Sequence, residues 1–154
     1  MGEKDVEIHR AGLADLDDIA VLFNAYRVFY RQTDDLDLAR AFIGERMERQ
    51  DSVIFIARGD EGRALGFTQL YPSFSSVSAQ AIWILNDLYI DDRVRSQGLG
   101  TQLLERARQW AIETGAKGVS LETERSNVGA QALYERLGYA QDSDHYFYFL
   151  ATPP

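Results

Sequence analysis

The stretch around two closely spaced glycines, Gly98 and Gly100, places the strongest constraint on the fold. It is preceded by the run "AIWILNDLYI" at residues 81–90, whose β-branched and aromatic residues are typical of a strand. Leu99 and Leu103 then begin an apolar pattern at helical spacing. The stretch therefore predicts a strand, a glycine-containing turn and a helix in direct succession.

The rest of the chain alternates between strand-like and helix-like patterns. Further strands are predicted at residues 6–10, 53–58, 64–71, 119–123 and 146–150. Helices are predicted from Leu16 to Tyr30, after the acidic residues at 34–37, from about Gly98 to Thr114, and at 127–137. We expect residues 53–58 and 64–71 to pair as a hairpin, and Pro72 with the serine-rich "SFSSVS" to interrupt the pattern.

The helix boundaries carry their own signals. Asp15 is a candidate N-cap of the first helix, and Gly115 and Gly138 are candidate C-terminal stops. Alternating elements of this length predict a mixed α/β fold, with a central sheet and helices on its faces. The 154 residues suit one domain, residues 1–154, with one site.

Composition narrows the classes of function. The chain has no cysteine and only two histidines, His9 and His145, so we expect neither a disulfide nor a metal site. A formal charge of −8 opposes sequence-independent nucleic-acid binding and favours cationic small molecules as partners. The apolar runs are too short to cross a bilayer. We therefore expect a cytoplasmic protein with no membrane contact.

The predicted strand-to-helix turn suits an anion. Small residues let backbone N–H groups approach a ligand, and the first turn of a helix has unpaired donors. Arg93 and Arg95 add positive charge just before the turn. The phosphate loop of nucleotide-binding proteins is excluded because no Gly-Lys follows the second glycine, and the dinucleotide fingerprint is excluded because Leu103 stands where it needs a glycine. A simple turn is the alternative reading of the glycine pair.

Two motifs resemble the GNAT superfamily of N-acetyltransferases. "RSQGLG" at residues 95–100, after "LNDLYI" and before "TQLLERA", is similar to the acetyl-CoA-binding core of that family. "SLETERSNVGAQALYERLGY" at residues 120–139 resembles the second half of the core. "LYPSFSS" and "YRVFYRQTDD" look like the diamine and polyamine branch. The resemblance implies a GNAT fold, with a mostly antiparallel, twisted and splayed sheet of six to seven strands and about four helices.

The resemblance also implies where acetyl-CoA binds. The pyrophosphate would rest on the amides from Ser96 to Thr101, and the pantetheine arm would lie along the strand before the loop as an extra strand. A β-bulge near Asn86 or Asp87 is expected with it, splaying the sheet. The implied cofactor-binding residues are Leu88, Tyr89, Ile90, Arg95, Ser96, Gln97, Gly98, Leu99, Gly100, Thr101, Asn127, Ala130 and Tyr134.

Three residues are implied in catalysis. The backbone N–H of Leu88 would face the developing oxyanion, and Tyr134 would donate a proton to the departing sulfur. Asp87 is the candidate base or ammonium ligand, although the polyamine enzymes carry Glu-Asp where this chain has Asn86 and Asp87. The alternatives are a core aromatic for Tyr134, a bulge-stabilising carboxylate for Asp87, and a helix cap for Asn127.

The acceptor site is less constrained by sequence. Tyr30, Asp34 and Asp35 fall where the family's variable first helical region borders the acceptor pocket, and Glu122 is a secondary candidate. Negative charge near a helix N-terminus is the alternative reading of the two aspartates. With Asp87, the candidate substrate-binding residues are Tyr30, Asp34 and Glu122.

We predict an acetyl-CoA-dependent N-acetyltransferase whose acceptor is a primary amine, with a small cationic amine as the first expectation. The amine would attack the acetyl group directly in a ternary complex. Without cysteine, a covalent acyl-enzyme is not expected. The alternatives are a protein or peptide amine as acceptor, and a CoA-binding module without catalysis. A homodimer is expected, with the aromatic end "HYFYFL" as either an interface strand or an internal one.

Overall fold

The computed structural model describes residues 5–154, which fall into two compact units divided between Glu122 and Thr123. The first unit contains the sheet and three α-helices, and the second contains one helix.

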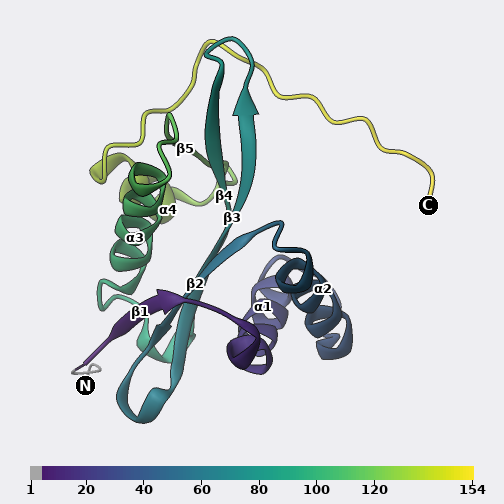
Figure 1. Cartoon of the computed structure of the whole chain (residues 1–154), viewed down its shortest axis with the longest axis vertical. Helices are drawn as coiled ribbons and strands as arrows, with labels where there is room; N and C mark the ends of the chain where they lie inside the picture. Colours follow the sequence, from purple (N-terminus) through teal and green to yellow (C-terminus); the bar gives the residue numbers. More distant parts are fainter. Residues whose placement is uncertain (1–4) are drawn as a thin grey trace. The chain divides into compact units, whose positions relative to one another are not determined.

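The first unit is built on a five-stranded sheet in the order β1-β2-β3-β4-β5 (Figure 1). The strands are β1 (Glu7–Arg10), β2 (Val53–Arg58), β3 (Ala64–Ser75), β4 (Gln80–Ile90) and β5 (Val119–Ser120). Neighbours pair antiparallel except β4 and β5, which are parallel. The predicted mostly antiparallel mixed α/β fold and the β2–β3 hairpin are confirmed, with five strands in the described residues rather than six to seven.

Helices cover both faces of this sheet. They are α1 (Leu16–Phe29), α2 (Leu36–Arg49) and α3 (Leu99–Glu113). Ile19 and Phe23 of α1 and Ile43 of α2 pack with Ile56 and Phe67 of the sheet in one buried cluster. Neighbouring β2 side chains alternate between faces. The face opposite α1 and α2 is accordingly covered by α3, whose Trp110 ring contacts the Phe55 ring at 6.0 Å between centroids.

Strand β3 continues beyond the predicted break at Pro72. Pro72 pairs with Trp83, and the ladder with β4 runs on to Ser75. The expectation that Pro72 interrupts the strand was wrong. Strand β2 pairs with β3 only as far as Leu70, so β3 has one strand neighbour at Pro72, and a proline without an N–H is tolerated on such an edge.

A β-bulge interrupts β4 at the predicted position. Gln69 pairs with Asp87 whereas the next residue, Leu70, pairs with Leu85, so Asn86 is the extra residue. Because strand side chains alternate, an extra residue shifts the pattern by one. Leu85 and Asp87, two positions apart, therefore belong to opposite faces of the sheet.

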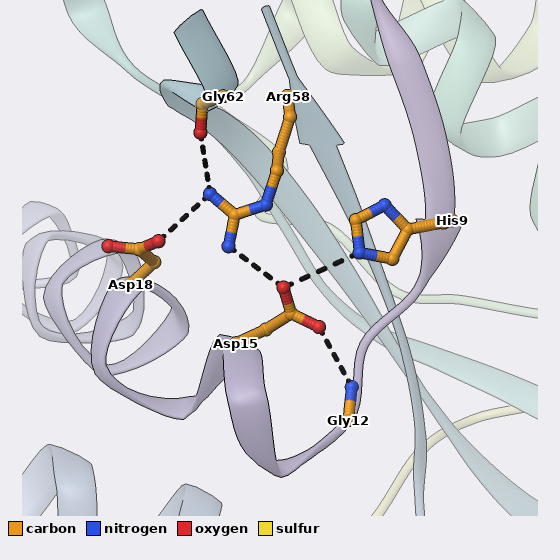
Figure 2. Close-up of polar contacts among 6 residues, drawn as sticks. All are labelled: His9, Gly12, Asp15, Asp18, Arg58 and Gly62. Atoms are coloured by element: carbon orange, nitrogen blue, oxygen red, sulfur yellow. Dashed lines mark hydrogen bonds and ion pairs between the residues drawn. The ribbon is translucent and has the colours of Figure 1, made fainter.

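Asp15 stands at the predicted N-cap position of α1, but its side chain does not bond to the helix amides. Its side chain makes no cap hydrogen bond, and a short 3₁₀ turn, Leu13–Asp15, precedes α1. Figure 2 shows the carboxylate turned instead toward Arg58, whose Nη2 lies 2.8 Å from Oδ1, while the Gly12 amide donates to Oδ2 at 3.0 Å. His9 Nε2 lies 3.4 Å from Oδ1. The charge of Arg58 thus takes Asp15 away from the helix amides and ties β2 to the start of α1.

The second unit holds helix α4 (Val128–Arg136). The Asn127 side chain accepts from the Ala130 amide at 3.2 Å, so its predicted cap is confirmed. No strand forms within residues 146–150, where Tyr146, Phe147, Tyr148, Phe149 and Leu150 are exposed. The predicted last strand was wrong: β-branched and aromatic residues favour a strand, but a strand also needs a paired neighbour.

In the first unit, the predicted strand at residues 119–123 is shortened to Val119–Ser120, the two residues that pair with β4.

Candidate active site

A cavity of about 370 Å³ lies in the first unit, beside the β4 bulge. Its lining comes from four elements, with Phe23, Tyr26 and Arg27 on α1, Leu38 and Phe42 on α2, Tyr71 on β3, and Asn86 and Asp87 on β4. The size is within the range of small-molecule sites, and a mostly aromatic and apolar wall with a few polar groups is their usual composition.

Asp87 is the most buried group of this lining, with a relative exposure of 1%. Its Oδ2 accepts from Gln69 Nε2 at 2.6 Å and its Oδ1 from Asn86 Nδ2 at 2.7 Å. No basic side chain forms an ion pair with it among residues 5–154. The carboxylate is therefore positioned by neutral amide donors, and its charge has no counterion within the described chain.

The position of Gln69 is itself fixed by a hydrogen bond. Ser52 Oγ donates to Gln69 Oε1 at 2.8 Å, which leaves the amide nitrogen for Asp87. Thr68 Oγ1 donates to the main-chain carbonyl of Asp87 at 2.7 Å. All four residues are buried, so this polar network holds the carboxylate in one orientation.

Burial raises the pKa of Asp87 above its ordinary value of 3.8, while hydrogen bonds from Asn86, Gln69 and Tyr26 act in the opposite direction. Burial and the nearby charge of Asp87 also raise the pKa of Tyr71 to about 12, and they raise that of Tyr26 further. At neutral pH both phenols stay protonated. They remain neutral hydrogen-bonding groups beside the carboxylate.

The bulge brings Asn86 and Asp87 to the cavity together. The extra residue lets both line the same cavity, and the main-chain carbonyl of Asn86 accepts from Tyr26 Oη at 3.2 Å. Strand β5 pairs with β4 only at Trp83 and Ile84. In the described chain, β4 from the bulge onward has a strand neighbour on the β3 side alone, so its other edge offers main-chain groups to an extended ligand.

The glycine-containing turn ends in an open helix N-terminus. Gly98, the N-cap of α3, has φ +80°, and Ser96 before it has φ +66°. No side chain caps the helix and no acidic residue lies in its first turn. A Cβ on Gly98 would meet no described atom within 4 Å. The amides of this turn therefore have both the direction and the space to donate hydrogen bonds to a bound anion.

The two arginines of the loop are held by nearby acidic residues. Arg93 Nη2 lies 2.8 Å from Asp91 Oδ2, and Arg95 Nη2 lies 2.9 Å from Asp92 Oδ1. Arg95 also lies over the Tyr89 ring, 5.4 Å from its centroid. The charge of the two arginines is thus partly neutralised. The backbone amides are therefore the main anion-binding groups of the turn.

The other residues predicted for the acceptor site are not part of the cavity lining. Asp34 accepts from Asn24 Nδ2 at 2.7 Å, and Asp35 caps α2 by accepting from the Leu38 amide at 3.0 Å. Tyr30 packs its ring against that of Tyr26, with 5.1 Å between centroids. Glu122 is exposed at the end of the first unit.

Sequence reasoning missed most of the cavity wall. The sequence places Tyr26 and Arg27 only within the predicted helix from Leu16 to Tyr30, and Tyr71 only within the predicted strand at residues 64–71. Phe23, Tyr26 and Arg27 are spaced i, i+3 and i+4, which puts all three on one helix face. A charged residue within an apolar helix face was the available signal for Arg27.

In the second unit, Tyr134 lies on α4 and its ring contacts that of Tyr139, with 5.9 Å between centroids. Asn127 and Ala130 belong to the first turn of the same helix, joined by the cap hydrogen bond. All of these residues belong to the second GNAT-like motif, at residues 120–139.

Comparison with known proteins identifies the family. Residues 16–139 match the model of the acetyltransferase (GNAT) family. The chain belongs to this family. The GNAT match spans both motifs, and the reaction class of the protein is acetyl-CoA-dependent N-acetyl transfer.

Relatives of this acetyltransferase agree with that class. It is 47% identical over 148 residues to the uncharacterized N-acetyltransferase YhfO of Bacillus subtilis (strain 168), covering 96% of this chain and 99% of that protein. It is 26% identical over 112 residues to the aminoglycoside N(6')-acetyltransferase type 1 of Serratia marcescens, and the match covers 71% of this chain and 77% of that protein. A crystal structure of a probable acetyltransferase superposes with a TM-score of 0.90 at 41% identity, and the match covers 96% of this chain and 99% of that one.

The acetyltransferase has no helix in residues 5–154 that is long and apolar enough to cross a membrane.

Proposed function

We propose that the cavity beside the β4 bulge receives the primary amine of a small molecule, and that the protein transfers the acetyl group of acetyl-CoA to it by direct attack in a ternary complex. One observation supports the proposal: Asp87 is buried at this cavity with no counterion among residues 5–154, so an ammonium group bound there would neutralise its charge. A desolvated carboxylate next to aromatic rings suits a cation.

Asp87 also addresses the difficult step of the reaction. An alkylammonium with a pKa of ~10.4 is almost wholly protonated at pH 7, a deficit of about 4 to 5 kcal/mol that the site must offset. The raised pKa of Asp87 makes its carboxylate a stronger base than an exposed aspartate. The proposed role is to bind the ammonium and then to take up or relay its proton.

Acetyl-CoA supplies the acetyl thioester and a diphosphate. The open N-terminus of α3, from Ser96 to Thr101, is the proposed site of the diphosphate, because its amides are uncapped and Gly98 leaves space in front of them. The edge of β4 at Leu88, Tyr89 and Ile90 that pairs with no described strand is the proposed track of the pantetheine arm. The Ile90 carbonyl itself accepts from Arg95 Nε at 3.0 Å. The Leu88 amide is the proposed donor to the oxyanion.

Tyr134 is the proposed proton donor to the departing thiolate, by resemblance to the family. A phenol with a pKa near ~10 can assist a thiolate with a pKa near ~8.5 as it leaves, because protonation is favourable once the carbon–sulfur bond breaks. Asn127 and Ala130 are proposed to contribute to the same cofactor site.

We propose that both units belong to one domain. The family match runs from residue 16 to residue 139 and so spans the division between Glu122 and Thr123, which supports the proposal. The cytoplasmic location, the homodimer and the diamine and polyamine branch stay predictions.

The test follows thiol release from acetyl-CoA with a panel of amino acids, diamines, aminoglycosides and peptides. We expect acceptor-dependent release with at least one small amine, and a loss of at least about 100-fold in kcat/KM in Asp87→Asn. Asp17→Asn, which alters an exposed ion pair with Arg40, is the matched control and should retain activity.

Other results would redirect the assignment. Acetyl-CoA binding without release for any acceptor would support a binding module. Release with peptides alone would support a peptide amine as acceptor. Full activity in Asp87→Asn would contradict the role of this carboxylate.

A further inference from the structure

Arg27 lines the same cavity as Asp87 and forms no ion pair with an acidic side chain among residues 5–154. Its Nη1 is buried and makes no hydrogen bond to any described residue. Several other arginines of the described chain pair closely with carboxylates, as Arg58 does with Asp15 at 2.8 Å and Arg46 with Asp51 at 3.0 Å. In a chain with a net charge of −8, an arginine without a carboxylate partner needs an explanation.

The ordinary explanation accounts for only part of this. Arg27 lies in the last turn of α1, where a positive charge is favourable to the helix dipole. An exposed side chain would serve that purpose equally well. Arg27 instead places a guanidinium nitrogen out of contact with water and leaves it unpaired, which costs free energy. The placement is therefore expected to serve a partner that comes from outside the chain.

The two charges of the cavity are of opposite sign and separate. Arg27 comes from α1 and Asp87 from β4, and they form no ion pair with each other. Apolar groups of Phe23, Leu38 and Phe42 complete the lining. A ligand that carried only an ammonium group would neutralise Asp87 and leave Arg27 unpaired. A second ammonium group, as in a diamine, would be repelled by Arg27.

We infer that Arg27 binds a carboxylate of the acceptor, so that the preferred acceptor is an amine that also carries a carboxylate group, such as an amino acid with an apolar side chain. The amine faces Asp87, the carboxylate faces the guanidinium, and the apolar side chain packs on Phe23, Leu38 and Phe42. The inference rests on the proposed function, because it names the acceptor class of the same cavity. Arg27 is thus a specificity-determining residue.

The test compares acceptors that differ only in the carboxylate. Thiol release from acetyl-CoA is measured with racemic phenylalanine and with phenethylamine, and again with racemic leucine and with 3-methylbutylamine. We expect kcat/KM to favour the amino acid by about 10-fold or more in each pair, as a charge-assisted hydrogen bond would give. A diamine of similar length is expected to be the poorest acceptor.

Substitution of Arg27 then isolates its role. Arg27→Gln should bring the ratio of the two kcat/KM values close to one, mainly through a higher KM for the amino acid, because the lost contact acts on binding. Arg27→Lys should restore part of the ratio. Arg40→Gln removes an exposed arginine outside the cavity and should keep the wild-type ratio. Intrinsic reactivity of each amine is the same with every variant, so the change in ratio reports on the guanidinium alone.

The possible outcomes separate the role of Arg27 from the proposed function. A wild-type ratio of one or below, or a ratio that Arg27→Gln leaves unchanged, overturns this inference while the proposed function stands. The wild-type comparison needs no variant, so it holds even where a substitution impairs folding. No release with any amine overturns the proposed function and this inference with it.

Discussion

The side-chain nitrogen of Gln69 lies 2.6 Å from Oδ2 of Asp87, and both residues are buried on paired positions of β3 and β4. This contact stabilises the ionised carboxylate, which burial alone would disfavour. It sets how strong a base Asp87 is, so it connects the packing of the sheet with the pH dependence proposed for the reaction.

Gln69→Leu should move the acid limb of the pH profile of kcat/KM to higher pH. The proposed reaction requires ionised Asp87, so kcat/KM is expected to rise with pH through the pKa of that carboxyl, which already lies above 3.8. Loss of the Gln69 hydrogen bond raises this pKa further. Thr68→Val is the matched control, because Thr68 donates to the main-chain carbonyl of Asp87 and not to its carboxylate. An unmoved limb in Gln69→Leu would show that another group titrates.

Gly98→Val should abolish acetyl-CoA binding, measured by calorimetry. A branched side chain would occupy the open space in front of the α3 amides and would strain a residue with φ +80° by about 1–2 kcal/mol. Gly115→Val carries the same kind of backbone strain at φ +70°, also with open space around its Cβ, but lies at the other end of the helix. If both variants bind acetyl-CoA as the wild type does, the diphosphate lies elsewhere.

Tyr134→Phe should lower kcat by about 100-fold and leave the Kd for acetyl-CoA within a few-fold, because only the proton donor is removed. Steady-state turnover and equilibrium binding measure the two effects separately. Tyr139→Phe removes the hydroxyl of the ring that contacts Tyr134 and serves as the comparison. Equal turnover of Tyr134→Phe and wild type would assign Tyr134 to packing alone.

The Asp15–Arg58 ion pair should make stability depend on acid pH. Burial would raise the pKa of Asp15, but hydrogen bonds from Arg58, the Gly12 amide and His9 outweigh it and lower the pKa below 3.8. A carboxyl with a lowered folded-state pKa stabilises the fold above its unfolded pKa, and this contribution is lost as the pH falls through the folded-state value.

Urea unfolding at pH 7 and pH 3 measures this contribution. The wild type should lose more stability between the two pH values than Asp15→Asn does. At pH 7, Arg58→Met should cost about 2 kcal/mol, because the Asp15 side chain is only 14% exposed and would lose its cationic partner. Equal pH dependence of wild type and Asp15→Asn would remove the pair from the acid response.

Local patterns predicted much of the fold. The hairpin of β2 and β3, the helix after Gly98, the Asn127 cap and the bulge at Asn86 are each specified by residues close in sequence or by the family motif. The wrong predictions involve partners far away in the chain. Asp15 is drawn to Arg58, 43 positions later, and the aromatic run at 146–150 has no neighbouring strand in the described chain.

The same distinction holds for the site. Asp87 was predicted because it lies inside a recognisable motif. Tyr26 and Arg27 reach the cavity from α1 and Tyr71 reaches it from β3, and only the packing of α1 against β3 and β4 brings them together. The spacing of Tyr26 and Arg27 predicts a shared helix face, but nothing local in the sequence predicts that this face packs beside Tyr71 of β3.

The bulge at Asn86 means that chain length, as much as side-chain identity, decides where the carboxylate points. If β4 alternated regularly through Leu85, Asn86 and Asp87, with each residue paired to one residue of β3, Asp87 would share the face of Leu85 and point away from the cavity. An engineer who grafts this strand into another scaffold must therefore preserve an uneven residue count between the two partners, or the transplanted site will face the wrong layer.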